Sequence, residues 1–258
     1  MSKDSPGRVL IVAFLLCIVC SILVSAAAVG LSTRQEKNKS EEKRKNILQA
    51  ANLYEAGVPI DEQFKKIEPR VVDLQTGEFT DRFDPATFDS RVAARDPKLN
   101  YQIPGNEDLA GIKTRSRYKD VYLVMDNQQL QQLILPVHGK GLWSTMYGFI
   151  ALAGDLNTVN GFGFYEHGET PGLGGEIDNP NWKKQWRGKK IYGPDEQVEI
   201  QVIKGTVDKS DPQAAFKADG LAGATLTGRG VDHLLKYWMG ANGYLPFLER
   251  LKKEGVKP

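Results

Sequence analysis

An almost unbroken apolar run near the N-terminus constrains this chain more than any other feature. Residues 9–31 (VLIVAFLLCIVCSILVSAAAVGL) contain no charged side chain. As a helix, these 23 residues would extend about 34 Å at ~1.5 Å per residue, against a hydrocarbon core of roughly 30 Å. We therefore expect a short tail at 1–8 and one transmembrane helix at 9–31.

A cleaved signal peptide is the alternative, because Val24-Ser25-Ala26 resembles a small-residue cleavage site. The run is longer than the usual apolar segment of a signal peptide and continues past that site, which favours a retained anchor. Two basic residues precede the run and six follow it within 32–45. Taken alone, this count places the body of the protein in the cytoplasm, although the rule is weak for long translocated domains.

The composition excludes several kinds of chemistry. Both cysteines, Cys17 and Cys20, lie inside the apolar run, so the rest of the chain has no disulfide, no thiolate nucleophile and no iron–sulfur ligand of its own. The three histidines, His138, His167 and His233, are isolated, and no spacing suggests a metal site. A net charge of +2 without a basic stripe argues against nucleic-acid binding.

Hydrophobic patterning predicts an α+β fold, with a largely antiparallel sheet and packed helices. We expect an amphipathic juxtamembrane helix or linker at 32–57 and a domain at 58–258, with a turn-rich peripheral region at 71–100. Strands are predicted at 121–125, 130–137, 146–152, 159–165 and 197–203, the first two forming a hairpin. Helices are predicted at 180–187, 230–239 and 245–252.

The run 219–228 (DGLAGATLTG) places small residues and hydroxyls directly before the helix predicted at 230–239. A helix N-terminus with nearby glycines favours an anion such as phosphate. Thr225 and Thr227 can equally serve only to cap the helix, Thr227 being the plausible N-cap. The local pattern leaves both interpretations open.

Two further glycine-rich stretches, 138–143 and 166–176, combine glycines with polar or aromatic side chains. Each can be a ligand contact or simply a tight turn. Neither matches a dinucleotide-binding or P-loop motif, and we find no NAD site and no catalytic residue set.

Together with the N-terminal anchor, three motifs resemble the C subunit of the Na⁺-translocating NADH:quinone reductase and, less closely, the G subunit of the Rnf electron-transport complex. The motifs are Gly139-Lys140-Gly141-Leu142-Trp143, Glu169-Thr170-Pro171-Gly172-Leu173-Gly174 and Gly223-Ala224-Thr225-Leu226-Thr227. In that family a flavin transferase joins the phosphate of FMN to a threonine in the motif Asp-x-x-(Ser/Thr)-Gly-Ala-Thr. Asp219, Gly223, Ala224 and Thr225 match this motif, whereas Ala222 replaces its Ser or Thr.

The resemblance implies a covalent FMN on Thr225 and no metal ion. The other residues implied as cofactor contacts are Trp143, Glu169, Thr170, Gly172, Leu173, Gly174, Gly223, Ala224 and Thr227. His138, His167 and Lys140 are candidates for tuning the flavin potential.

The resemblance also implies a place and partners for the chain. The domain is expected on the periplasmic side of a bacterial inner membrane, which contradicts the charge count. It would pass electrons from an iron centre on one subunit to a flavin on another, in a complex that oxidises NADH, reduces ubiquinone and exports Na⁺ or H⁺. The chain itself would bind neither NADH nor quinone. The alternatives are an Rnf-type subunit and a membrane-anchored scaffold without flavin.

Overall fold

The structure, a computed structural model, describes residues 6–256, without the side chains of residues 33 and 36. The chain forms two compact units whose boundary lies between Arg44 and Lys45. Residues 1–5 of the expected N-terminal tail lie outside the described residues.

The first long element is the helix α1 (Pro6–Ala50). Its segment Pro6–Ser32 is long and apolar enough to cross a membrane, and it is exposed along its length. The last residues of α1 belong to the second unit, where Ile47 and Leu48 are buried. The helix ends at Ala50, earlier than the predicted end at Gly57, because Asn52 adopts a left-handed conformation (φ 57°) and the Leu53 N–H bonds the Leu48 carbonyl.

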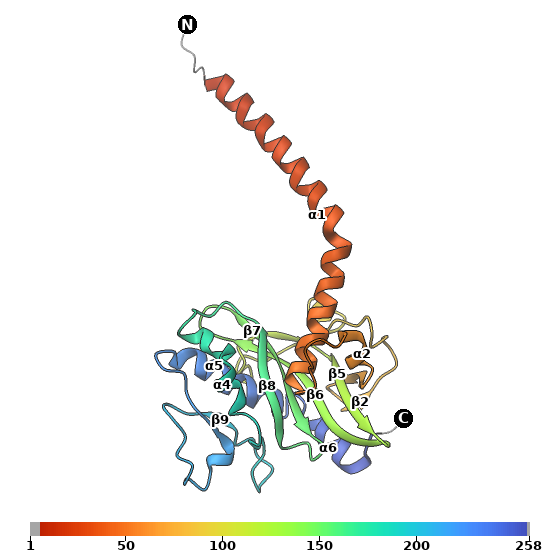
Figure 1. Ribbon diagram of the computed structural model, residues 1–258, viewed down its shortest axis with the longest axis vertical. Coiled ribbons are helices and arrows are strands. Elements are labelled where there is room, and N and C mark those ends of the chain that lie inside the picture. The colour runs from red at the N-terminus through yellow and green to blue at the C-terminus, as the bar shows by residue number, and fades with distance from the viewer. Residues whose placement is uncertain (1–5, 257–258) are drawn as a thin grey trace. The chain divides into compact units, whose positions relative to one another are not determined.

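A six-stranded antiparallel sheet forms the centre of the second unit (Figure 1). Its spatial order is β2-β1-β5-β6-β7-β8. The strands are β1 (Ile67–Asp73), β2 (Glu78–Phe79), β5 (Tyr118–Asp126), β6 (Gln129–Lys140), β7 (Thr145–Ala153) and β8 (Val159–Glu166). The predicted hairpin and the strands at 146–152 and 159–165 are confirmed, and an antiparallel sheet with packed helices is the expected fold class.

Both faces of the sheet are buried, because alternate residues of each central strand enter different cores. Leu133 and Leu135 of β6 pack with the helices α5 (Thr225–Met239) and α6 (Leu245–Glu254). Ile134, between them, packs on the other face with Ile47 and Leu48. This two-sided burial explains why the central strands are almost continuously apolar in sequence.

Short elements complete the unit. They are α2 (Ile60–Phe64), α3 (Ser90–Ala93), β3 (Asn100–Gln102), β4 (Thr114–Ser116), η1 (Gly174–Asp178), α4 (Pro180–Lys184), β9 (Gln201–Val202), η2 (Ala214–Phe216) and β10 (Lys217–Ala218). Two predictions were too long. The strand predicted at 197–203 reduces to β9, which pairs in parallel with β10, and the helix predicted at 180–187 ends at Lys184.

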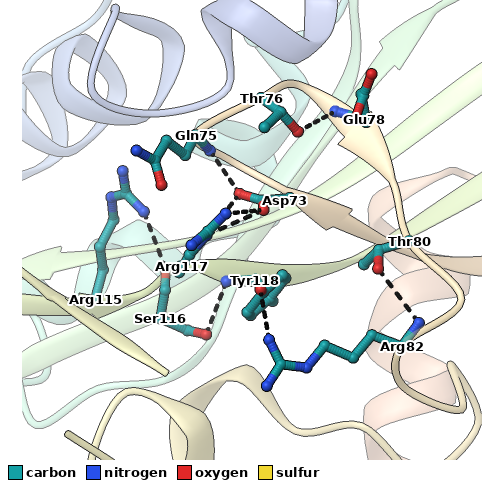
Figure 2. A network of polar contacts seen from close by, with 10 residues as sticks. All are labelled: Asp73, Gln75, Thr76, Glu78, Thr80, Arg82, Arg115, Ser116, Arg117 and Tyr118. Carbon is teal, nitrogen blue, oxygen red and sulfur yellow. Dashed lines mark hydrogen bonds and ion pairs between the residues drawn. The ribbon is translucent and has the colours of Figure 1, made fainter. Parts of the chain in front are cut away.

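A polar network fixes the peripheral region to the sheet (Figure 2). Asp73, at the end of β1, accepts two hydrogen bonds on Oδ2 from the Arg117 guanidinium, at 2.7 and 3.0 Å. Its Oδ1 accepts from the Gln75 N–H at 2.9 Å and from Arg117 Nε at 3.1 Å. Arg82 donates to the Tyr118 hydroxyl at 3.0 Å. The network therefore joins the β1–β2 turn, the start of β5 and the segment that follows β2.

The substitution Asp73→Ala should lower the free energy of unfolding by about 1–3 kcal/mol, because it leaves the Gln75 N–H and the Arg117 guanidinium without their acceptor. Urea unfolding of the full chain in detergent, followed by tryptophan fluorescence, measures this loss. The matched control is Glu68→Ala, whose partly exposed ion pair with Arg70 should contribute at most about 1 kcal/mol. Equal losses in both variants would contradict a special role for Asp73.

Candidate functional site

The three glycine-rich stretches meet at the buried carboxylate of Glu169. One oxygen, Oε1, accepts hydrogen bonds from the N–H groups of Trp143 (3.0 Å) and Ser144 (3.3 Å). The other, Oε2, accepts from the Leu142 N–H (3.2 Å) and the Thr227 hydroxyl (2.5 Å). Glu169 therefore connects the loop after β6 and the first turn of α5 to the loop after β8.

Each of these three segments adjoins a strand of the sheet or helix α5, which fixes its position. Loop 141–144 joins β6 to β7, and segment 167–173 follows β8. Besides the bonds to Glu169, a further bond between the two loops runs from the Gly168 N–H to the Ser144 hydroxyl at 2.6 Å. Helix α5 approaches so closely that a Cβ added to Gly230 would lie 2.5 Å from the Lys140 carbonyl oxygen.

Crowding around Glu169 accounts for two of the glycines. A Cβ added to Gly141 would lie 2.5 Å from Glu169 Oε1, and one added to Gly174 would lie 2.5 Å from the Thr227 hydroxyl. Neither distance is compatible with an unshifted side chain. Gly172 and Gly223 are different, because they adopt left-handed conformations (φ 75° and 69°) that a side chain would strain.

Glu169 is held in its charged form. Burial acts to raise the pKa of this carboxyl, but the hydrogen bonds from Thr227, Trp143, Leu142 and Ser144 together lower it below its ordinary value. Glu169 therefore carries a negative charge at neutral pH, at the point where the three segments meet.

Thr225 begins helix α5 and is exposed. Within residues 6–256, no hydrogen bond to its hydroxyl is found. The prediction that Thr227 caps the helix is wrong, since the Gly228 N–H bonds the Ala224 carbonyl at 3.0 Å and the N-cap is Ala224, three residues earlier. Thr227 instead lies buried in the first turn and donates to Glu169. An exposed hydroxyl at the positive end of a 15-residue helix can receive an anionic group.

Four large apolar side chains are exposed on the segments that Glu169 connects. They are Leu142, Trp143, Leu173 and Leu226, which we call the exposed apolar set. Trp143 is 66% exposed, and Leu173 lies over Gly223, where an added Cβ would come within 3.1 Å of it. Such side chains offer a flat ligand an apolar contact surface.

A hollow of about 320 Å³ opens beside Thr225. Lys204 and Arg229 line it together with the backbone of Gly205 and Gly220. Asp232, also in its wall, is engaged by the Val202 N–H and by Lys236. Local motifs give no signal for Lys204 and Arg229, because only the folded chain brings the 202–205 segment to the start of α5.

The remaining candidates divide into two groups. Thr170 and Gly172 lie on the exposed turn before η1, where the Thr170 carbonyl accepts from the Leu173 and Gly175 N–H groups. His138 is not at the site, because its ring contacts Tyr147 and Trp238. Burial, with Lys119 and Arg91 nearby, lowers the pKa of His138 well below its ordinary value.

Asp219 supports the segment that leads to Thr225. Its carboxylate accepts from the Val207 N–H at 2.8 Å, and its carbonyl accepts from the Trp182 indole at 3.0 Å. The motif aspartate therefore fixes the start of the small-residue run to Val207 and to Trp182 of α4. Ala222, at the position where the motif has Ser or Thr, is exposed.

Comparisons with known proteins show the family to which this domain is similar. Residues 141–240, which include Glu169 and Thr225, match the family model of the FMN-binding domain. The C subunit of the Na⁺-translocating NADH-quinone reductase of Pseudomonas aeruginosa is 50% identical, covering 98% of this chain and 98% of that protein. The same subunit of the Yersinia pestis enzyme is 43% identical, covering 99% and 97%.

Solved structures show the same relationship. The crystal structure of NqrC from Shewanella oneidensis superposes with a TM-score of 0.78 at 34% identity, covering 84% of this chain and all of that one. The structure of the corresponding reductase subunit from Parabacteroides distasonis gives a TM-score of 0.66 at 28% identity, covering 84% and 96%.

The charge on Glu169 predicts an acid-sensitive site. Because its pKa is lowered on folding, Glu169 stabilises the protein above its ordinary pKa of about 4.3, and this contribution is lost as the pH falls through the folded-state value. Glu169→Gln should lower the unfolding free energy by about 1–3 kcal/mol near pH 6, and the difference from the wild type should shrink towards pH 3.

Urea unfolding at a series of pH values measures this difference. Thr227→Val, which removes one donor and leaves the carboxylate, should give a smaller loss with the same trend. A difference between wild type and Glu169→Gln that stays constant from pH 6 to pH 3 would contradict the assignment.

Proposed function

Because this chain belongs to the C-subunit family of the Na⁺-translocating NADH-quinone reductase, we propose that it holds FMN on Thr225 through a phosphodiester bond and carries electrons within that complex. The observation that carries the proposal is the exposed hydroxyl at the start of α5, placed between an apolar surface and a basic hollow. The match of residues 141–240 to an FMN-binding domain supports the identity of the cofactor.

The attachment chemistry suits Thr225. A flavin transferase would use FAD, so that the bond from Thr225 Oγ1 to the flavin phosphorus forms while the bond to the AMP half breaks. The hydroxyl proton is lost and no redox change occurs. Exposure of Thr225 gives the transferase access, and the helix N-terminus stabilises the negative phosphate.

The residues around Thr225 fit both halves of FMN. Lys204 and Arg229 line the hollow beside Thr225 and would offset the charge of the phosphate. The exposed apolar set would contact the ring, with Thr170, Gly172 and Gly174 on the neighbouring turn. Glu169 would hold the loops in place, since both of its oxygens are engaged by protein donors.

When bound, FMN can accept and donate one or two electrons, which is chemistry that amino-acid side chains do not supply. The contribution of the chain is to fix the cofactor to one residue, so that it cannot diffuse away, and to present it at an exposed surface. NADH, quinone and the coupling ion would be handled by other subunits of the complex.

The same proposal gives the chain its place in the cell. The segment Pro6–Ser32 would anchor it in the bacterial inner membrane, with residues 58–258 as the periplasmic FMN-binding domain and 32–57 as the connection. Its partners would be a subunit with an iron centre, a second flavin-bearing subunit and, during maturation, the flavin transferase.

Covalent attachment predicts a fluorescent band. Wild-type protein coexpressed with the transferase should keep flavin fluorescence on a denaturing gel, and Thr225→Leu should lose it completely because the acceptor oxygen is gone. Thr206→Val, at another exposed threonine, should keep it. Mass spectrometry of the Thr225 peptide should show one FMN group. A colourless wild type would favour the scaffold alternative, and a fluorescent Thr225→Leu band would refute this attachment site.

The placement of the ring predicts a second effect. A tryptophan in contact with a flavin quenches its fluorescence, so Trp143→Ala should raise flavin emission in the folded, loaded protein while leaving the denatured gel band unchanged. Leu109→Ala removes a side chain that is 50% exposed and lies outside the exposed apolar set, and it should change neither signal. Unchanged emission in Trp143→Ala would place the ring elsewhere.

A further inference from the structure

His167 joins Glu169 to the solvent-exposed side of the site. Its Nε2 lies 2.8 Å from Asp178 Oδ2, and its Nδ1 accepts the Glu169 N–H at 3.2 Å. A backbone N–H can only donate, so Nδ1 must be unprotonated, and the hydrogen of the neutral ring is on Nε2, facing Asp178. The geometry therefore requires one tautomer of the neutral imidazole.

A connected line of contacts extends in both directions from this ring. Asp178, on η1, also pairs with Lys183 of α4 at 2.9 Å. At the other end, Glu169 binds the N–H groups of loop 141–144 and the Thr227 hydroxyl in the first turn of α5. The line ends two residues from Thr225, the proposed attachment site.

Protonation of His167 would break this line at one point. Nδ1 would then carry a hydrogen that points at the Glu169 N–H, and two donors facing each other cannot form a hydrogen bond. The turn from His167 to Glu169 would lose its local bond, while the contact with Asp178 would gain a full charge. The Glu169 backbone would lose a contact that fixes its position, while its carboxylate keeps its four donors.

The charged groups around the ring support such a response. Burial acts to raise the pKa of Asp178, but hydrogen bonds from Lys183 and His167 lower it below its ordinary value, so it remains a carboxylate that can stabilise a protonated ring. Glu169 also has a lowered pKa and stays charged. Glu166, adjacent in sequence, is paired with Arg91 at 2.6 Å. Histidine is the side-chain type that ordinarily changes charge between about pH 5 and pH 8.

We propose that His167 is a positioning residue that makes the hold of Glu169 on loop 141–144 and on the start of α5 dependent on pH. The neutral ring accepts the Glu169 N–H and keeps the site ordered (the locked state). The protonated ring cannot accept it, so the site is less ordered (the loosened state) and carries an added positive charge. The effect on the cofactor rests on the function proposed above, whereas the coupling within the protein does not require a cofactor.

Two substitutions separate the two halves of the imidazole. In His167→Asn, the side-chain Oδ1 can accept from the Glu169 N–H, as in an Asx turn, and the amide does not change charge between pH 5 and pH 8. In His167→Gln, the longer side chain can reach Asp178 but cannot accept from the Glu169 N–H. His167→Asn therefore fixes the locked state, and His167→Gln fixes the loosened one.

Hydrogen exchange of the Leu142, Trp143 and Ser144 amides in the full-length protein in detergent tests the coupling. After correction for the intrinsic pH dependence, wild-type protection should fall about 3- to 10-fold between pH 8 and pH 5, as expected for the loss of one hydrogen bond. His167→Asn should stay protected at both pH values, and His167→Gln should be less protected at both. The proposal would be overturned if wild-type protection did not change with pH, or if protection in His167→Asn fell between pH 8 and pH 5 as in the wild type.

Controls separate this inference from the proposed function. Thr225→Leu, which cannot carry the flavin there, should keep the pH transition of the amides. His233→Asn should also keep it, since His233 lines the hollow beside Thr225 and is not one of the residues in this line of contacts.

The flavin-loaded protein supplies an independent readout. A positive charge on His167 favours an electron-rich cofactor, so the midpoint potential of wild-type protein should rise more between pH 8 and pH 5 than that of His167→Asn. Identical pH dependences of the potential would show that His167 does not act on the cofactor, even if the amides respond.

Discussion

The site depends on one buried negative charge. The Glu169 carboxylate accepts four hydrogen bonds from groups that lie 25 to 58 residues away in the chain. Charged acceptors form stronger hydrogen bonds than neutral ones, and removal of a buried acceptor leaves its donors unsatisfied. The sheet fixes two of the segments and α5 fixes the third, but Glu169 determines how their ends meet. The orientation of Thr225 and of the exposed apolar set follows from that arrangement.

The sequence predicted the parts of this fold that local pattern controls. Strands β5 to β8 show clear apolar runs, and the turn at Asn127-Gln128 adopts left-handed conformations at both residues that suit a two-residue hairpin. The start of α5 was missed because it depends on a backbone bond from Gly228 to Ala224, whereas the apolar period begins only at Val231. Strand β1 (Ile67–Asp73) is not predicted from the sequence, and the turn-rich region predicted at 71–100 wrongly includes its end, because pairing with β5 across the 74–117 segment leaves no local signal.

The candidate site was predicted at the level of residues but not of partners. The resemblance implies Glu169 and Thr227 as cofactor contacts, whereas the structure shows them bonded to each other. Composition alone does not distinguish a glycine that admits a ligand from one that admits a neighbouring carboxylate. The exposure of Trp143, Leu173 and Leu226 cannot be predicted from the sequence either, since large apolar side chains are more often buried and only the fold shows that these are not.

The crowding at Gly141 and Gly174 also constrains how this protein can change over time. A methyl group at either position would collide with Glu169 or Thr227, so replacing either glycine requires one of those two side chains to move from its hydrogen-bonded position. A shorter acid at 169 would make room but would no longer reach all of its donors. The effects of substitutions at these four positions should therefore be coupled, because the side chain tolerated at one depends on the residues at the others.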